Sequence, residues 1–313
     1  MSDQGWDTCV FRYRYKTTNA VDALLKNRLF FSIPAKFNDP FDNDAFINYQ
    51  QLYQDIIINL KIGMDDYLEL HKKDMLPLHY NVVTYLWNQN RMNAVTNYLY
   101  TVYNACENVK SIIRENVKMI CFSYDYENIL MWSHYASYHE GFCLVYEKDA
   151  ILKGNIYDTK GLRCYRKLDF VDVDYSQTRL DFTNEMHYCL LKNSIPYYTK
   201  PDFIDIPNKR IKDFLKHKSN VWDYEKEIRL IPHVNDLNTQ CSLSYIEVKP
   251  KAIILGCKST DVTIVKPIVK YCLENGIKLF RMLPEDNKAE FKLTLNEIPY
   301  EEYDYILRAK YLA

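Results

Sequence analysis

Hydrophobic and polar residues alternate strictly from Phe11 to Lys16, and this pattern predicts a half-buried strand. One face carries the aromatic side chains and the other the basic ones, namely Phe11, Tyr13 and Tyr15 against Arg12, Arg14 and Lys16. Apolar residues at helical spacing from Val21 to Leu25 then predict a helix with Asn19 as its N-cap. A short strand follows at Leu29 to Ser32.

The middle of the chain changes from helical to strand-like patterns. Apolar residues recur three and four apart between about residues 46 and 117, which predicts a helical insertion. Beyond it we expect a strand at Val117 to Tyr124, a helix at Ile129 to Tyr138 with Asn128 as N-cap, and a strand at Gly141 to Glu147.

The last part of the chain contains further strands between helices. Predicted strands are Glu227 to Pro232, Leu243 to Val248, Ala252 to Leu255, Ile277 to Arg281 and Phe291 to Leu295; predicted helices are Thr183 to Leu191, Ile206 to Lys218 and Val262 to Asn275. The chain has no internal repeat or Gly/Ser linker. We therefore expect a single α+β domain over residues 1–313, with the helical insertion at about 46–117.

Charge and composition narrow the class of protein. The 313 residues have a formal net charge of −1, which disfavours bulk electrostatic binding to nucleic acid or membrane. The sequence lacks a long uncharged apolar stretch, and MSDQGWDTCV does not resemble a signal peptide. The nine cysteines never form CxxC, which disfavours a zinc site. These features predict a cytoplasmic protein with no membrane partner.

Standard nucleotide-binding and hydrolase motifs are absent from the sequence. It contains no GxGxxG, GxxxxGK[ST], HExxH or GxSxG, and its seven glycines make a backbone cradle for phosphates improbable.

The segment VWDYEKEIRLIPH, from Val221 to His233, is the most informative window. On a strand, Glu225 and Glu227 would point to the same face. One interpretation is an exposed strand with solvated acids and Arg229 as a salt-bridge partner. The other is catalytic, because a fixed carboxylate stabilises an oxocarbenium-like transition state such as that of glycosidic cleavage, and a second acid can activate the nucleophile.

The residues EKEIRLIP, from Glu225 to Pro232, resemble the ExE strand of ADP-ribosyltransferases. Those enzymes also use a basic or His residue on an early strand and a Ser- or Tyr-bearing middle strand, and Arg14 and Ser123 occur in the corresponding order. The resemblance implies a split β-sandwich that binds NAD as substrate. It further implies that Glu227 stabilises the ribose cation, Glu225 positions the acceptor and Arg14 anchors NAD.

A second resemblance covers nearly the whole chain. The motifs FRYR, FSIPAKFNDPFD, ICFS, LMWSHYASYHEGFCLVYE, WDYEKEIR and KAIILG occur in the order found in the bacterial domain of unknown function 2971 family. This resemblance implies that FNDPFD, MWSHY and the W-x-Y-E-x-E-x-R segment belong to one shared site or core.

Further residues are candidates for lining the NAD pocket. Ser123 and Tyr13 would line the nicotinamide–ribose pocket. His134 and Tyr138, one turn apart on the predicted helix, would face the same cleft, or His134 would simply pack among Trp132 and Tyr135. A metal pair is disfavoured because the next histidine, five residues on, faces elsewhere.

Two charged segments have both structural and functional interpretations. The acidic loop around Asp39, Asp42 and Asp44 would hold its own backbone or, in the alternative, bind a hard cation. The basic run Lys209 to Lys218 is a solvated helix face or a set of phosphate contacts.

The leading hypothesis is an NAD-dependent ADP-ribosyltransferase or NAD glycohydrolase, with protein or nucleic acid as the acceptor. By analogy alone, such a protein would be a toxin or an antiviral defence effector. One alternative is a non-enzymatic sensor or protein-interaction module on a degenerate ADP-ribosyltransferase scaffold. The other is a metal-dependent phosphoesterase that uses the acidic loop.

Overall fold

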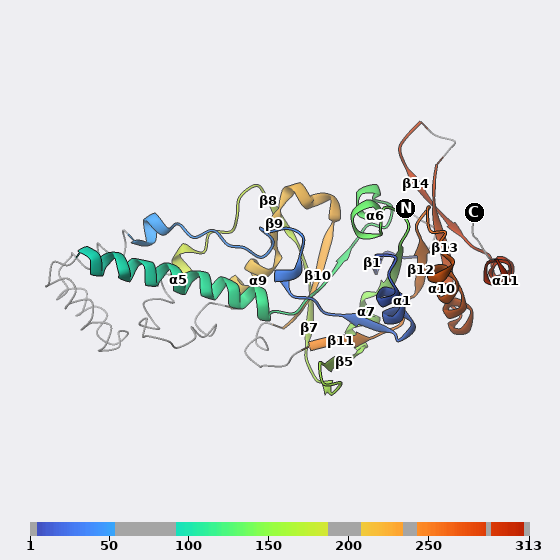
Figure 1. Ribbon diagram of the computed structural model, residues 1–313, viewed down its shortest axis with the longest axis horizontal. Coiled ribbons are helices and arrows are strands. Elements are labelled where there is room, and N and C mark those ends of the chain that lie inside the picture. Colours follow the sequence, from blue (N-terminus) through green and yellow to red (C-terminus); the bar gives the residue numbers. More distant parts are fainter. Residues whose placement is uncertain (1–4, 54–91, 187–207, 234–242, 286–288, 310–313) are drawn as a thin grey trace. The chain divides into compact units, whose positions relative to one another are not determined.

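The computed structural model of the protein describes residues 5–53, 92–186, 208–233, 243–285 and 289–309. The chain divides into two compact units, where the sequence pattern predicts one domain. Unit 1 comprises Met1–Ser32, Lys118–Val173 and Asn220–Ala313, and unit 2 comprises Ile33–Val117 and Asp174–Ser219. Unit 2 thus contains the predicted helical insertion together with a second, later segment (Figure 1).

Unit 1 is built around an eight-stranded sheet. Its strands run in the order β14 (Leu293–Glu297), β13 (Lys278–Pro284), β12 (Ala252–Leu255), β4 (Phe142–Glu147), β1 (Cys9–Arg14), β3 (Ile120–Ser123), β10 (Glu227–Pro232) and β7 (Leu168–Asp172). The β12 and β13 strands are parallel and are joined by helix α10 (Val262–Asn275), whereas the other neighbouring pairs are antiparallel. The mixed sheet with helices confirms the α+β class.

Unit 1 also contains a smaller antiparallel sheet. It contains β2 (Arg28–Phe30), β11 (Leu243–Glu247), β5 (Asn155–Asp158) and β6 (Arg163–Cys164) in that order. The unit also includes helices α1 (Thr18–Leu25), α6 (Ile129–Tyr135), α7 (Lys148–Lys153) and α11 (Tyr300–Arg308), and the 3₁₀ helix η3 (Asn220–Glu225).

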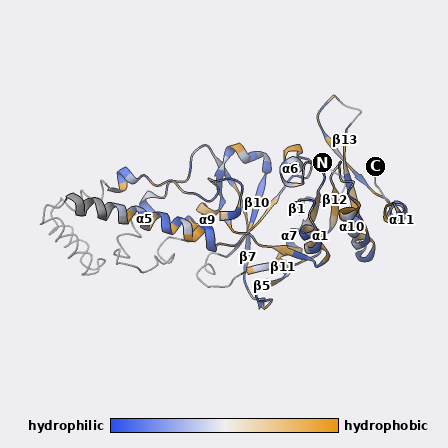
Figure 2. Ribbon diagram, viewed as in Figure 1, coloured by the Kyte–Doolittle hydropathy of each residue, from blue (hydrophilic) through white to orange (hydrophobic). Residues whose placement is uncertain are grey.

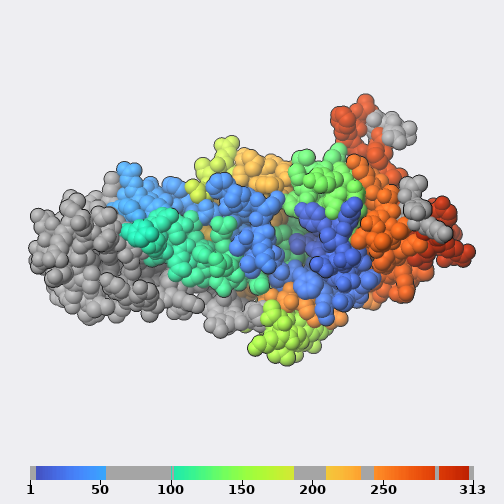
Figure 3. All heavy atoms as spheres, viewed as in Figure 1, coloured from blue at the N-terminus to red at the C-terminus, as the bar shows by residue number. Residues whose placement is uncertain are grey.

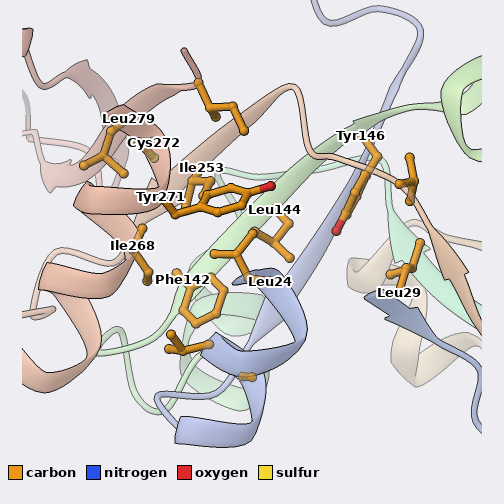
Figure 4. Close-up of a cluster of buried hydrophobic side chains, with 14 of the residues drawn as sticks. Leu24, Leu29, Phe142, Leu144, Tyr146, Ile253, Ile268, Tyr271, Cys272 and Leu279 are labelled. Atoms are coloured by element: carbon orange, nitrogen blue, oxygen red, sulfur yellow. The ribbon is translucent and has the colours of Figure 1, made fainter. Parts of the chain in front are cut away.

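Two hydrophobic clusters cover opposite faces of the main sheet, because successive side chains of a strand alternate between faces. What we call the α10 face carries Val10, Phe122, Leu144, Ile228 and Ile253, and it packs with side chains of α1 and α10. Figure 4 shows this cluster, with Leu24 of α1 and Ile268 of α10 against Leu144 and Ile253. The α6 face carries Phe11, Tyr13, Cys143, Ile254 and Phe280, together with Trp132 of α6.

The first helix begins two residues earlier than its sequence predicts. Its N-cap is Thr17, whose hydroxyl accepts a hydrogen bond from the Ala20 backbone N–H, so the prediction of Asn19 as N-cap was wrong. Thr17 has the extended backbone that a cap needs, whereas Asn19 lies within the helix. The predicted N-cap of α6 is confirmed, since the Asn128 side chain accepts from the Leu130 and Met131 backbone N–H groups.

Helix α6 ends at Tyr135, three residues before the predicted end. Ser137, Tyr138 and His139 have φ values of 49°, 56° and 72°, in the left-handed region that residues other than glycine seldom adopt. The backbone N–H groups of Tyr138 and His139 return to the carbonyls of Ser133 and Trp132. The chain therefore leaves the helix through a left-handed turn, and Tyr138 is not a helical residue.

Unit 2 contains mostly helices in its described part. These are α5 (Met92–Asn116), α9 (Asn208–Lys216) and the short 3₁₀ helix η1 (Pro34–Lys36), and strands β8 (Asp174–Ser176) and β9 (His217–Ser219) pair in parallel. The α5 helix confirms the second half of the predicted insertion, while residues 54–91 lie outside the described part. Residues 183–186 are helical, and the rest of the predicted 183–191 helix also lies outside it.

The predicted strand Glu227 to Pro232, strand Ala252 to Leu255 and helix Val262 to Asn275 match the observed elements in both bounds. Strand β12 stands out as hydrophobic in Figure 2, as expected of a strand buried on both faces. In Figure 3 the dark blue N-terminal segment of unit 1 lies between the green region of α6 and the orange region of β12 and α10. Across the described residues, we find no helix with the length and apolar character needed to cross a membrane.

Candidate functional site

The three strands that carry the predicted catalytic motifs are neighbours in one sheet. They lie in the order β1, β3, β10, although they are far apart in the sequence. Ser123 pairs with Phe11 on one side and with Glu227 on the other. Because directly paired residues and residues two apart share a face, Tyr13, Ser123 and Glu227 all lie on the α6 face.

Glu227 forms a buried, two-pronged ion pair with Arg229. Arg229 Nε lies 2.9 Å from Glu227 Oε1 and Nη2 lies 3.1 Å from Oε2. Glu227 is 6% exposed and Arg229 is fully buried, since β10 is flanked by β3 and β7. The expected salt bridge is therefore present, but the expectation of solvated acids on an exposed strand was wrong.

The sequence pattern placed Glu225 on the same strand as Glu227, but Glu225 lies outside β10. It ends the 3₁₀ helix η3, and Lys226 then takes a left-handed φ of 44° before β10 begins at Glu227. The turn breaks the period-two alternation, so the spacing of the two acids does not by itself put them on one face. Glu225 is nonetheless buried, and its Oε1 accepts a hydrogen bond of 2.5 Å from the Tyr135 hydroxyl.

Ser123 and Tyr13 are held by hydrogen bonds to the backbone of the same region. Ser123 Oγ donates to the Glu225 carbonyl at 2.6 Å and accepts from the Asp125 N–H at 2.9 Å. Tyr13 Oη donates to the Asp125 carbonyl at 2.8 Å, and its ring packs edge-on against Trp132. Burial raises the Tyr13 pKa well above its usual value, so this phenol stays protonated.

Arg14 is separated from this group of residues. Its strand neighbour is Phe142, and it lies on the α10 face with Val10 and Leu144, opposite to Glu227. Burial, and secondarily the nearby Arg12, lowers its pKa to about 10. The expected convergence of Arg14 with Glu227 is therefore absent, because consecutive residues of a strand point to opposite faces and Arg14 follows Tyr13.

His134 and Tyr138 are both exposed, and they are not a pair on one helix. The His134 ring lies 6.3 Å from the Tyr224 ring, centroid to centroid, while Tyr138 is 76% exposed on the left-handed turn. The α6 side chain that reaches one of the two acids is instead that of Tyr135, which bonds Glu225. Its position between His134 and the turn in the MWSHY motif is the sequence signal that could have identified it.

His139 is the last of the three left-handed residues that follow α6. Its Nε2 is 3.0 Å from Ser133 Oγ, and its Nδ1 is buried without a hydrogen-bond partner among the described residues. It borders a surface hollow of about 430 Å³ that Cys257 and Lys258 also line. Glu227 is not among the residues that line this hollow.

The acidic loop of unit 2 is held together by its own backbone and by cations. Asp39 Oδ1 accepts from the Phe41 N–H at 2.9 Å, as the structural interpretation predicts. Asp42 Oδ2 lies 3.6 Å from Lys218 Nζ, and Asp44 Oδ1 lies 2.8 Å from Lys110 Nζ. In the part of the chain that the structure describes, no three or more His, Cys, Asp or Glu residues are grouped to hold a metal ion.

Several charges of the basic run lie beside carboxylates. Arg210 Nε lies 2.5 Å from Glu185 Oε1, and Lys216 Nζ lies 2.7 Å from Asp174 Oδ2. Ile211, Phe214 and Leu215 of the same helix are buried. These contacts favour the interpretation of α9 as a packed, ion-paired helix.

The protein has an α+β fold in which strand β10, between β3 and β7, carries the buried carboxylate of Glu227. Within it, residues 131–230 match the model of a family described as protein of unknown function (DUF2971). The match supports the resemblance over the α6 to β10 region, which contains the MWSHY and W-x-Y-E-x-E-x-R motifs. No curated protein and no solved structure matches the chain.

Proposed function

We propose that unit 1 binds NAD and cleaves its nicotinamide–ribose bond, as an ADP-ribosyltransferase or an NAD glycohydrolase on an ADP-ribosyltransferase-like fold. The observation that carries the proposal is the position of Glu227 at the start of β10, directly opposite Ser123 and on the same face as Tyr13. In this arrangement a carboxylate, a serine hydroxyl and a phenol from three neighbouring strands occupy one side of the sheet.

The proposed chemistry uses Glu227 to stabilise positive charge on the ribose. Cleavage of a glycosidic bond develops an oxocarbenium-like charge, and a fixed carboxylate in a dry site stabilises it. The hydrogen bonds from Arg229 fix the orientation of the Glu227 carboxylate, so little reorganisation is needed during reaction. Glu225, held by Tyr135, would position the acceptor. Arg14 contributes nothing to this proposal because it lies on the opposite face.

The test follows nicotinamide release from NAD by the purified protein, together with transfer of labelled ADP-ribose to protein and nucleic acid of a cell lysate. We expect the Glu227→Gln variant to lose about 100-fold or more in rate, the size of effect seen when a transition-state charge contact is removed. Glu274→Gln, a change at an exposed position of α10, is the matched control and should retain full activity. Loss of activity in Glu227→Gln with unchanged NAD binding by calorimetry separates a chemical role from misfolding.

A second candidate function is the non-enzymatic sensor or protein-interaction module. The observation that favours it is the two-pronged Glu227–Arg229 pair, because a guanidinium already compensates the charge of that carboxylate. Nicotinamide release no faster than in buffer, no NAD binding by calorimetry and a stable partner in a pulldown would support this candidate and contradict the enzymatic one.

A further inference from the structure

Strand β1 presents two guanidinium groups on the α10 face. Arg12 pairs with Leu144 and Arg14 with Phe142, both of which belong to the cluster on that face. Residues two apart on a strand have Cα atoms about 6.5 Å from one another, so long side chains at these positions can reach a common ligand. The sequence pattern FRYRYK shows the alternation but not which face is buried.

The edge of β1 next to β3 is only partly closed by backbone pairing. Strand β1 pairs with β4 at six positions, from Cys9 to Arg14, but with β3 at one position, Phe11 with Ser123. Beyond Phe11, the Arg12 Nη1 group donates a hydrogen bond to the Cys121 carbonyl of β3. The Arg12 side chain therefore bonds a carbonyl of β3 that the β1 backbone does not pair with. A guanidinium has five N–H donors in all.

Neither guanidinium has an acidic partner in the described part of the chain. Lys16, two residues beyond Arg14, pairs with Glu140, whereas Arg12 and Arg14 form no ion pair among the described residues. Arg14 is largely buried, and the lowering of its pKa to about 10 has burial as its first cause and Arg12 as its second. Two nearby cations of this kind without a counter-ion are costly in a folded protein.

A phenol donor lies beside the two cations. Tyr146 pairs with Val10 on the same face and is 2% exposed, and both arginines affect its electrostatic environment. Burial raises the Tyr146 pKa, so the hydroxyl keeps its proton. Its oxygen has no hydrogen-bond partner among the residues described. Figure 4 shows its ring within the cluster, on the side of the sheet that Leu24 and Leu29 occupy.

We propose that Arg12, Arg14 and the Tyr146 hydroxyl form a binding site for a phosphate dianion, on the sheet face opposite Glu227. Guanidinium groups bind phosphate through paired N–H···O bonds, and a phosphate offers more acceptor oxygens than a single carboxylate. A phosphate with about two negative charges matches two cations that form no ion pair with any described residue. The site goes beyond the proposed NAD cleavage and does not depend on it.

The test measures the unfolding temperature of the full-length protein with inorganic phosphate or pyrophosphate at constant ionic strength. We expect a saturable rise for the unchanged protein, because a ligand that binds only the folded state stabilises it. Arg14→Gln should weaken the apparent affinity about tenfold or more, which corresponds to about 1.4 kcal/mol. The same variant should be as stable as the unchanged protein, or more so, in phosphate-free buffer, because it removes a largely buried cation that forms no ion pair within the described part of the chain.

Two control variants make the outcome decisive. Lys16→Gln changes an exposed cation just beyond the end of β1 that already has an acidic partner, and it should keep the full response to phosphate. Glu227→Gln should also keep it, even if NAD cleavage is lost, because Glu227 lies on the other face. A phosphate response that is absent, that persists in Arg14→Gln, or that disappears in Glu227→Gln would overturn the proposal. A rise with NAD but not with pyrophosphate would overturn it as well.

Discussion

His139 has a neutral imidazole held in a partly buried position. Burial, followed by the nearby Lys258, lowers its pKa below the usual 6.5. The unfolded chain therefore takes up a proton at a higher pH than the folded protein does. Because the unfolded state binds more protons in this window, stability falls as the pH decreases from above 6.5 towards the folded pKa.

We predict that the His139→Gln variant removes this part of the pH dependence. The free energy of unfolding should be measured by urea denaturation between about pH 5 and pH 8, the range in which histidine titrates. The stability of the unchanged protein relative to His139→Gln should decline as the pH falls. His134→Gln, which replaces an exposed histidine of α6, is the control for the substitution itself. A difference between the unchanged protein and His139→Gln that is constant over this range would contradict the assignment.

Residue types were easier to identify from the sequence than residue positions. The Glu227–Arg229 pair follows from period-two spacing on a strand and was foreseen as a salt bridge. The position of Glu225 was not foreseen, because Lys226, between the two acids, has a left-handed backbone that breaks the strand alternation. Lysine has no local preference for a left-handed backbone, so the sequence pattern does not indicate the turn at Lys226.

The left-handed turn after α6 is the element whose geometry departs furthest from its sequence. Ser137, Tyr138 and His139 have positive φ values without any glycine, which costs about 1–2 kcal/mol per residue. The turn is confined by close backbone contact, since a Cβ on Gly256 would lie 2.1 Å from the His139 carbonyl oxygen. Packing therefore fixes a conformation that local propensity disfavours.

We predict that Tyr138→Gly does not destabilise the protein and stabilises it by up to about 1 kcal/mol, because glycine adopts positive φ without a steric penalty. The matched comparison is Leu130→Gly, at an exposed position within α6, which should cost about 1 kcal/mol. Urea denaturation of both variants measures the two free energies. An equal loss of stability in the two would show that strain at Tyr138 is negligible.

Element boundaries were predictable where local chemistry fixes them. The α10 helix begins after Asp261, whose side chain accepts from the Thr263 N–H, and ends before Gly276 in the left-handed conformation. Both are strong local signals, and both bounds of α10 were predicted. The predicted cap of α1, Asn19, was wrong, because Thr17 two residues earlier has the extended backbone and the side-chain hydrogen bond of the cap.

The order of strands in the main sheet required the three-dimensional structure. Each strand of β4, β1, β3 and β10 is recognisable alone, but β1 and β10 are separated by more than half of the chain. Pairing of this kind depends on long-range packing that local patterns do not encode. The division into two units has the same origin, because unit 2 is assembled from two segments that are separated by part of unit 1.

Two compact units in one chain predict two unfolding transitions in calorimetry, because separate cores lose their packing independently. Ile254→Ala removes buried side-chain volume from unit 1 and Phe214→Ala from unit 2, at a cost of about 2–5 kcal/mol each. Each variant should lower the temperature of one transition by several degrees and leave the other in place. Tyr305→Ala, at a position 74% exposed on α11, should move neither. A single transition that both core variants lower equally would mean that the two units unfold as one cooperative structure.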